Sequence, residues 1–156
     1  MSAALLFLHL LGSALWIGGA LAAMAARLGS HREGPEGEAL AARLLARIHI
    51  YVIAPGALLT TAAGFGIAFE YMSRGMNDLM SAPAMSTMMG TGLLATILVL
   101  FVGLPTAQKI AALAVTSTDG SFPPSFSRLR TRQAWVQTIA GVLALVALYC
   151  GALWRR

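Results

Sequence analysis

The chain of 156 residues is 58% hydrophobic and only 11% charged, and it carries a formal net charge of +5. Ordinary soluble domains are roughly 25% charged, so this composition excludes a soluble domain and predicts one integral membrane domain over residues 1–156. No nucleic acid is expected as a partner, because the basic residues lie between apolar runs, where they orient helices in the bilayer.

Four segments without an acidic or basic residue other than histidine follow one another, at residues 2–26, 48–69, 84–104 and 133–154. About 20 apolar residues span the hydrocarbon core of a bilayer, so each segment predicts a transmembrane helix. The expected fold class is all-α, a four-helix transmembrane bundle without a soluble domain. Its surroundings are therefore expected to be the lipid bilayer.

The stretches between these segments give the expected loops and irregularities. Residues 27–47 are polar and are counted as the first loop, and Pro55 is expected to kink the second helix because proline removes one backbone hydrogen bond. Residues 106–115 are predicted to continue the third helix as a short surface helix. Ser125 is expected to cap the last helix.

The Lys and Arg residues indicate how the bundle is oriented. The first and third loops together hold eight of them, whereas the second loop and the C-terminus hold three. Cytoplasmic loops of membrane proteins carry the excess of Lys and Arg. We therefore predict that the first and third loops are cytoplasmic and that both termini lie outside.

One face of the first helix is expected to point into the bundle. At about 100° per residue, six residues share this face: His9, Gly12, Ser13, Trp16, Ala20 and Ala23. An ionisable residue within a membrane span, here His9, is a functional-site hypothesis by default. Small residues four positions apart let helices approach closely, and three pairs show this spacing: Ala14 with Gly18, Ala62 with Gly66, and Ala147 with Gly151.

Methionine is concentrated in one part of the chain. Six of the eight methionines lie within 18 residues, on the predicted outer side: Met72, Met76, Met80, Met85, Met88 and Met89. Thioethers are soft ligands that favour Cu(I). By helix rise, His9, Met88 or Met89, and Cys150 all lie roughly 6 to 9 Å below the outer membrane surface. Their convergence predicts a copper site with Met85 and the loop methionines as an access path; the alternative is that methionine fills gaps between helices.

His49 is expected near the cytoplasmic start of the second helix, at the level of Gln137, and a hydrogen bond between the two side chains is predicted. In a bilayer core of roughly 30 Å, His9 and His49 should differ in depth by well over 10 Å. That difference disfavours a haem held by both histidines. A haem held by His9 with Met88 or Met89 stays open, since His/Met ligation is known chemistry.

Signals of an enzyme are poor. No Asp or Glu lies inside a predicted span, so the chain offers no carboxylate pair for acid–base catalysis there. A phosphate-binding loop, a Ser-His-Asp pattern and a CxxC motif are also missing from the sequence. We name no catalytic residue and favour a protein without catalytic activity.

Residues 8–19, Leu-His-Leu-Leu-Gly-Ser-Ala-Leu-Trp-Ile-Gly-Gly, resemble the first-helix motif of the CopD-like superfamily of small bacterial integral membrane proteins. Residues 53–56 and 61–64 resemble the second helix of that family, and residues 104–105, 122–124 and 128–135 resemble its members of unknown function. The resemblance implies four helices in a bacterial inner membrane. Through the copper-resistance D relatives, it also implies copper uptake or resistance.

A second resemblance concerns haem. The succession His9, Trp16, Arg27 and His31 is similar to the first-helix pattern of HemJ-type protoporphyrinogen oxidase, which binds haem b. This resemblance implies His9 and Trp16 as cofactor-binding residues. The second half of the chain departs from that family, because the third span holds no lysine and the fourth does not begin with an Arg-Asn-Glu-Pro-like sequence.

The leading hypothesis is therefore a small membrane protein that binds or handles copper at the outer face of the membrane. Its expected metal ligands are His9, Met85, Met88, Met89 and Cys150. The first alternative is a haem b-binding membrane protein. The second is a non-catalytic accessory subunit of a larger membrane complex, or a homo-oligomer, without any metal.

Overall fold

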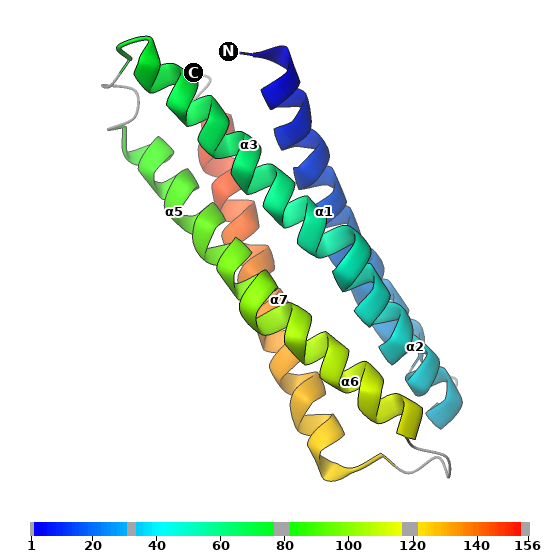
Figure 1. Ribbon diagram of the computed structural model, residues 1–156. Coiled ribbons are helices and arrows are strands. Elements are labelled where there is room, and N and C mark those ends of the chain that lie inside the picture. Colours follow the sequence, from blue (N-terminus) through cyan, green and yellow to red (C-terminus); the bar gives the residue numbers. More distant parts are fainter. Residues whose placement is uncertain (1, 31–33, 77–81, 117–121, 154–156) are drawn as a thin grey trace.

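The computed structural model describes residues 2–30, 34–76, 82–116 and 122–153, and these form a bundle of four long helices (Figure 1). The first helix is α1 (Ala3–Ser30). The second consists of α2 (Gly34–Ile48), the π-helical turn η1 (His49–Ile53) and α3 (Ala54–Ser73). The third consists of α5 (Pro83–Ile97), the π-helical turn η2 (Leu98–Gly103) and α6 (Leu104–Thr116), and the fourth is α7 (Pro124–Leu153). All four are long and apolar enough to cross a membrane, so the predicted all-α four-helix fold is confirmed.

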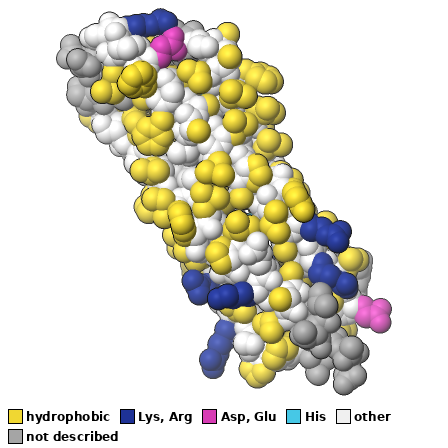
Figure 2. Space-filling view, in the orientation of Figure 1, with side chains coloured by type: hydrophobic (Ala, Val, Ile, Leu, Met, Phe, Trp, Pro, Cys, Tyr) yellow, Lys and Arg dark blue, Asp and Glu magenta, His cyan; other side chains and the backbone are white. Residues whose placement is uncertain are grey.

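The two ends of the bundle differ in charge. Both chain ends lie at one end, beside the end of α3 and the start of α5, and we call this the termini end (Figure 1). Most of the Lys and Arg side chains visible in Figure 2 gather toward the opposite end. The face between these ends is largely hydrophobic, as a lipid-facing surface requires.

The described part of residues 27–47 is helical, so the prediction of a loop there was wrong. The helix α1 continues to Ser30, and α2 begins at Gly34. Although α2 is polar overall, one face of it is buried and made of small residues, Gly37, Ala41, Ala42 and Ala46. The helix α2 packs against α6 and α1, and Ala42 of this face lies in a cluster with Ile110 and Ala114 of α6. An amphipathic helix thus extends the bundle beyond the apolar span, because an apolar run marks the depth of the bilayer and not the length of the helix.

Each proline in the interior of a long helix follows a π-helical turn. The N–H of Ala54 donates to the carbonyl of His49, and the N–H of Leu104 donates to the carbonyl of Val99, each spanning five residues. Proline has no N–H, and its ring collides with the carbonyl four residues earlier in a regular α-helix. The wider turn accommodates this ring. A π-helical turn thus precedes Pro55, the position of the predicted kink, and a second one precedes Pro105.

The helix α6 continues beyond Pro105 as predicted, but it is not a surface helix. Its residues Ala107, Ile110 and Ala114 are buried, and Ile110 and Ala114 share a cluster with Ala42 of α2 and Phe126 of α7. The apolar positions recur every three or four residues, which is the period of a helix face that packs inward. The last helix begins at Pro124, so Ser125 lies in its first turn and not at the predicted cap position.

The helices α1 and α3 cross with their backbones in close contact. A Cβ atom placed on Gly12 would lie 2.6 Å from the backbone nitrogen of Thr60, and one on Gly56 would lie 2.7 Å from the backbone nitrogen of Trp16. Only glycine leaves room for such an approach, which is the usual role of small residues between membrane helices. The buried face of α1 includes Gly12, Trp16 and Ala23, in agreement with the predicted inward face.

The small-residue pairs predicted from spacing alone agree with the packing only in part. Gly66 and Gly151 face side chains of other helices, those of Leu5 and Met88. Gly18, in contrast, is exposed and has open space around its Cα, and Ala14 is also exposed. The Ala14–Gly18 prediction was therefore wrong, because the spacing is common in membrane helices and does not identify the face that packs.

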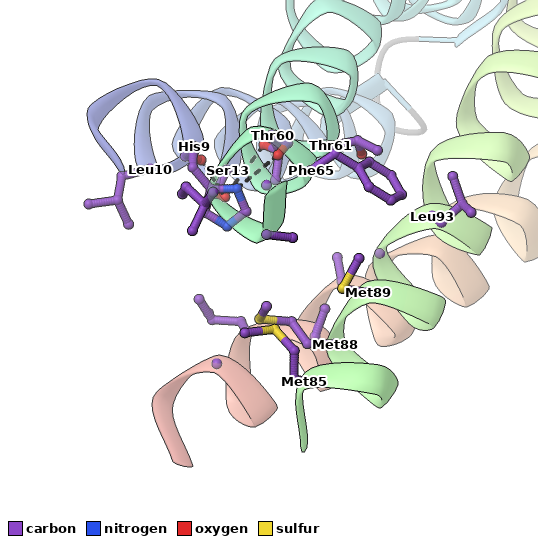
Figure 3. A pocket seen from close by; sticks show the side chains of 18 of the residues that line it. His9, Leu10, Ser13, Thr60, Thr61, Phe65, Met85, Met88, Met89 and Leu93 are labelled. Atoms are coloured by element: carbon purple, nitrogen blue, oxygen red, sulfur yellow. Dashed lines mark hydrogen bonds between the residues drawn. The ribbon is translucent and has the colours of Figure 1, made fainter. Parts of the chain in front are cut away.

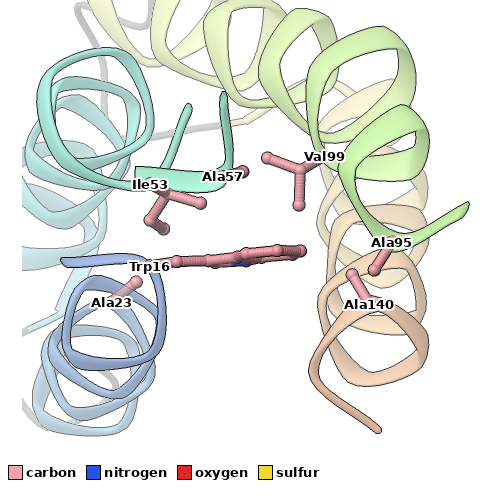
Figure 4. Close-up of a cluster of buried hydrophobic side chains, with 7 residues drawn as sticks. All are labelled: Trp16, Ala23, Ile53, Ala57, Ala95, Val99 and Ala140. Carbon is pink, nitrogen blue, oxygen red and sulfur yellow. The ribbon is translucent and has the colours of Figure 1, made fainter. Parts of the chain in front are cut away.

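Trp16 fills the centre of the bundle. Its side chain is 5% exposed and packs in a cluster with Ile53 and Ala57 on one side and Ala95, Val99 and Ala140 on the other (Figure 4). The indole thus extends from α1 to the pair formed by α5 and α7. This single aromatic ring in an otherwise aliphatic cluster thus contacts both helix pairs, and aromatic side chains bury the largest apolar areas.

Candidate functional site

A cavity of about 610 Å³ lies in the half of the bundle that holds the termini. On this half α1 packs extensively on α3, and α5 packs extensively on α7, whereas the two pairs touch each other little. The cavity is the space between the pairs, and Trp16 belongs to its lining. Its volume falls in the range of roughly 300–1,000 Å³ that is typical of small-molecule and cofactor sites.

His9 lies on the α1/α3 wall of this cavity. Its Nδ1 lies 2.8 Å from the backbone carbonyl oxygen of Thr60, and since a carbonyl can only accept, Nδ1 carries the proton and donates. The ring also lies against Gly64, where an added Cβ would be 3.2 Å from Nδ1. These two contacts fix the ring and leave Nε2 with a lone pair that faces the cavity (Figure 3).

Three methionines line the opposite wall. Met85, Met88 and Met89 all come from the first turns of α5 and border the same cavity as His9 (Figure 3). Met85 is buried, whereas Met88 and Met89 are half-buried. The sulfur of Met88 lies beside Gly151 of α7, at 3.1 Å from the position of an added Cβ. The structure therefore brings together four of the five predicted metal ligands on one cavity.

Cys150, the fifth predicted ligand, does not border the cavity. The α7 residues in the cavity wall are Ala144, Ala147, Leu148, Gly151 and Ala152, and Cys150 lies beside this face of the helix. Its depth agrees with the prediction, but one residue along a helix rotates a side chain by about 100°. Of the methionines proposed as an access path, Met72 is exposed near the end of α3, and Met80 lies outside the described residues.

The hydroxyl groups in the cavity are largely engaged with neighbouring helices. Ser13 donates to the carbonyl of His9 at 2.8 Å, and its oxygen is 3.4 Å from Oγ1 of Thr60. Thr61 and Thr96 form a hydrogen bond of 2.7 Å that connects α3 to α5. Sequence reasoning missed the threonines and Gly64, because a backbone carbonyl or a missing side chain has no distinctive sequence signal.

His49 occupies a separate polar cluster in the other half of the bundle. It is 1% exposed, and its Nδ1 lies 3.2 Å from the carbonyl oxygen of Leu45, to which it donates. Its Nε2 accepts from the side-chain amides of Gln137 and Gln133. The predicted His49–Gln137 hydrogen bond is confirmed. His49 does not border the cavity of His9, which agrees with the argument against a bis-histidine haem.

The fold defines a multi-pass integral membrane protein of four helices with a cavity inside one half of the bundle. No cluster of three or more His, Cys, Asp or Glu residues with metal-binding geometry occurs in the described part of the chain. A metal in this cavity would therefore depend on His9 together with methionine sulfur. Comparison of the chain with protein-family models, curated proteins and solved structures gave no match.

Proposed function

We propose that the protein binds a metal centre in this cavity, with Cu(I) as the first candidate. The observation that carries the proposal is the orientation of the His9 ring. Its Nδ1–H donates to the Thr60 carbonyl, while Nε2 faces the cavity. Metal-binding histidines almost always donate their other ring N–H to a carbonyl, a carboxylate or water, which orients the ring and raises its basicity. His9 has this arrangement.

The chemistry of the lining supports a soft ion. Met85, Met88 and Met89 supply thioethers, and no described residue in the cavity wall carries a carboxylate. Hard divalent cations prefer oxygen ligands, whereas thioether and imidazole suit Cu(I). His9 with one or more of the three methionines would hold the ion. The orientation predicted from the basic residues would place this site on the outer side of a bacterial inner membrane, where it would serve copper binding or handling.

Haem b is the second candidate, favoured by the size of the cavity. A volume of about 610 Å³ is far larger than one ion needs. Gly64, Gly92 and Gly151 in the wall have no side chain, and the indole of Trp16 adds an aromatic surface. His9 and a methionine across the cavity are an axial pair that haem iron accepts.

Metal content and absorption spectrum of the purified protein distinguish these candidates. If the metal is Cu(I), the loaded protein should be colourless and contain one copper ion per chain. His9→Ala should weaken copper binding by at least about tenfold. Met88→Leu should also weaken it, whereas the matched variant Met72→Leu, at an exposed position, should not. Cys150→Ser should leave the affinity unchanged, because Cys150 is not in the cavity wall.

The other outcomes of this experiment are equally definite. A Soret band that disappears in His9→Ala selects haem over copper. Protein that carries neither copper nor haem, and does not take up either, contradicts the metal proposal. That result would favour the accessory subunit of a larger membrane complex, whose interface would need no metal.

Gly64→Ala tests the role of the ring position. The added methyl group would stand 3.2 Å from the imidazole and push it toward the cavity centre by a few tenths of an ångström. Metal affinity should fall by about tenfold, because the hydrogen bond to Thr60 that orients the ring is disturbed. Gly90→Ala, on α5 with open space around it, is the matched control and should bind metal like the unchanged protein.

A further inference from the structure

The cavity has features that metal binding does not require, and they lie at the seam between α1 and α7. Leu10 of α1 and Leu148 of α7 both border the cavity, and each is 53% exposed on the outer surface of the bundle. Such residues form a rim, because they face the cavity and the surroundings together. The contacts between α1 and α7 are few compared with those of either helix with its main partner.

The rim residues lie at a depth that hydrocarbon would fill in a bilayer centred on the apolar spans. Leu10 lies seven residues from the start of α1, which is about 10 Å along the helix at 1.5 Å per residue. The hydrogen bonds of His9 and Ser13 join α1 to α3, and that of Thr61 joins α3 to α5. None of these bonds joins α1 to α7. A molecule dissolved in the bilayer therefore meets the cavity at this seam without crossing a polar barrier.

The polar groups of the cavity define the head group that fits. Nε2 of His9 is an acceptor, because Nδ1 carries the proton. The Thr60 hydroxyl lies 3.4 Å from the Ser13 oxygen and can donate to it, because the Ser13 proton goes to the His9 carbonyl. No described residue of the wall is acidic or basic apart from His9. A neutral hydroxyl group satisfies Nε2 of His9, because it donates a hydrogen bond and brings no charge into the apolar cavity.

We infer that the cavity binds an uncharged, membrane-soluble amphiphile with a hydroxyl head group, which enters sideways between α1 and α7. The head group donates to Nε2 of His9, and the apolar part extends past Leu10 and Leu148 toward the lipid. This inference rests on the shape of the cavity and on His9, and it does not depend on whether a metal binds. A metal on Nε2 would compete with the head group.

A pair of probes that differ in one hydrogen-bond donor tests the head group. Metal-free protein in detergent is titrated with 4-nonylphenol and with its methyl ether, 4-nonylanisole. The variant Trp135→Phe/Trp154→Phe is used, so that the change in tryptophan fluorescence comes from Trp16 alone. The phenol should bind about tenfold more tightly, the effect of one hydrogen bond in apolar surroundings. In His9→Phe the two probes should bind equally. Equal binding of both probes to the unchanged His9 protein refutes the head-group assignment.

A matched pair of leucine variants tests the lateral route. Leu148→Phe narrows the seam and should slow association of the phenol several-fold while its preference over the ether is kept. Leu145→Phe, at a position that is 56% exposed but does not border the cavity, should associate at the unchanged rate. Equal rates in both variants would show that the probe enters elsewhere. Copper and haem titrated in parallel separate the two proposals. Phenol selectivity without uptake of either contradicts the metal proposal alone, and metal binding without phenol selectivity contradicts this inference alone.

Discussion

The crossing of α1 and α3 makes a strong prediction about Gly56. A methyl group there would lie 2.7 Å from the backbone nitrogen of Trp16 and 2.9 Å from the carbonyl oxygen of Gly12. Both are backbone atoms that cannot rotate away, so the helices must separate. The separation needed is about 0.7 Å, the difference between 2.7 Å and the 3.4 Å at which ordinary contact begins.

The cost of Gly56→Ala follows from two opposing effects. Overpacking a close contact costs about 1–3 kcal/mol, and the upper value applies here because backbone meets backbone. Alanine recovers about 1 kcal/mol of helix propensity relative to glycine. The net loss in the free energy of unfolding is therefore about 2 kcal/mol. Gly18→Ala, which meets open space, gains the propensity without the clash and should be neutral or slightly stabilising.

Reversible unfolding in mixed micelles, with denaturing detergent as the variable, measures both variants on one scale. The same experiment has a functional readout, because a separation of about 0.7 Å would lengthen the His9–Thr60 hydrogen bond from 2.8 Å to about 3.5 Å. Gly56→Ala should then also weaken binding of any ligand at Nε2 of His9. If Gly56→Ala unfolds at the same detergent fraction as Gly18→Ala, the close crossing described here does not exist.

Two further predictions concern the other half of the bundle and its orientation. Gln137→Leu removes an amide donor from the buried imidazole of His49, and the free energy of unfolding should fall by about 1–3 kcal/mol; an unchanged value in the micelle assay would mean that the cluster contributes nothing. In a Cys150→Ser background, Ser73→Cys at the termini end should react with an impermeant thiol reagent in intact cells, and Ser127→Cys at the opposite end should not. The reverse labelling pattern would invert the orientation derived from the basic residues.

Sequence patterns gave the depth of most functional side chains correctly and their direction less well. His49 and Gln137 were matched by depth, and a hydrogen bond joins them. Cys150 was placed at the depth of the cavity, yet Gly151 borders the cavity instead. Depth changes by only about 1.5 Å per residue, whereas direction changes by about 100°, so a small error in register moves a side chain to another face.

The packing partners could not be read from the sequence for a related reason. Gly12 of α1 and Gly56 of α3 lie against each other where the two helices cross. Which glycines become neighbours depends on how the helices are connected and where they cross. The four-residue spacing of small residues also occurs at Ala14 and Gly18, which face outward. The anchoring of His9 depends on a main-chain oxygen at Thr60, and every residue offers such an oxygen. Only the folded arrangement distinguishes the one that binds.

The π-helical turns before Pro55 and Pro105 act like single-residue insertions in otherwise regular helices. Each contains one residue more than a regular turn. The side chains after the turn are therefore rotated by about 100° about the helix axis, compared with an uninterrupted helix. The helix α2 can therefore direct its alanines toward α6 while α3 directs Thr60 and Gly64 toward His9. Loss of one residue from η1 would turn the cavity wall away from the imidazole without removing any of its side chains, so the length of this turn is as much a determinant of the site as the residues that line it.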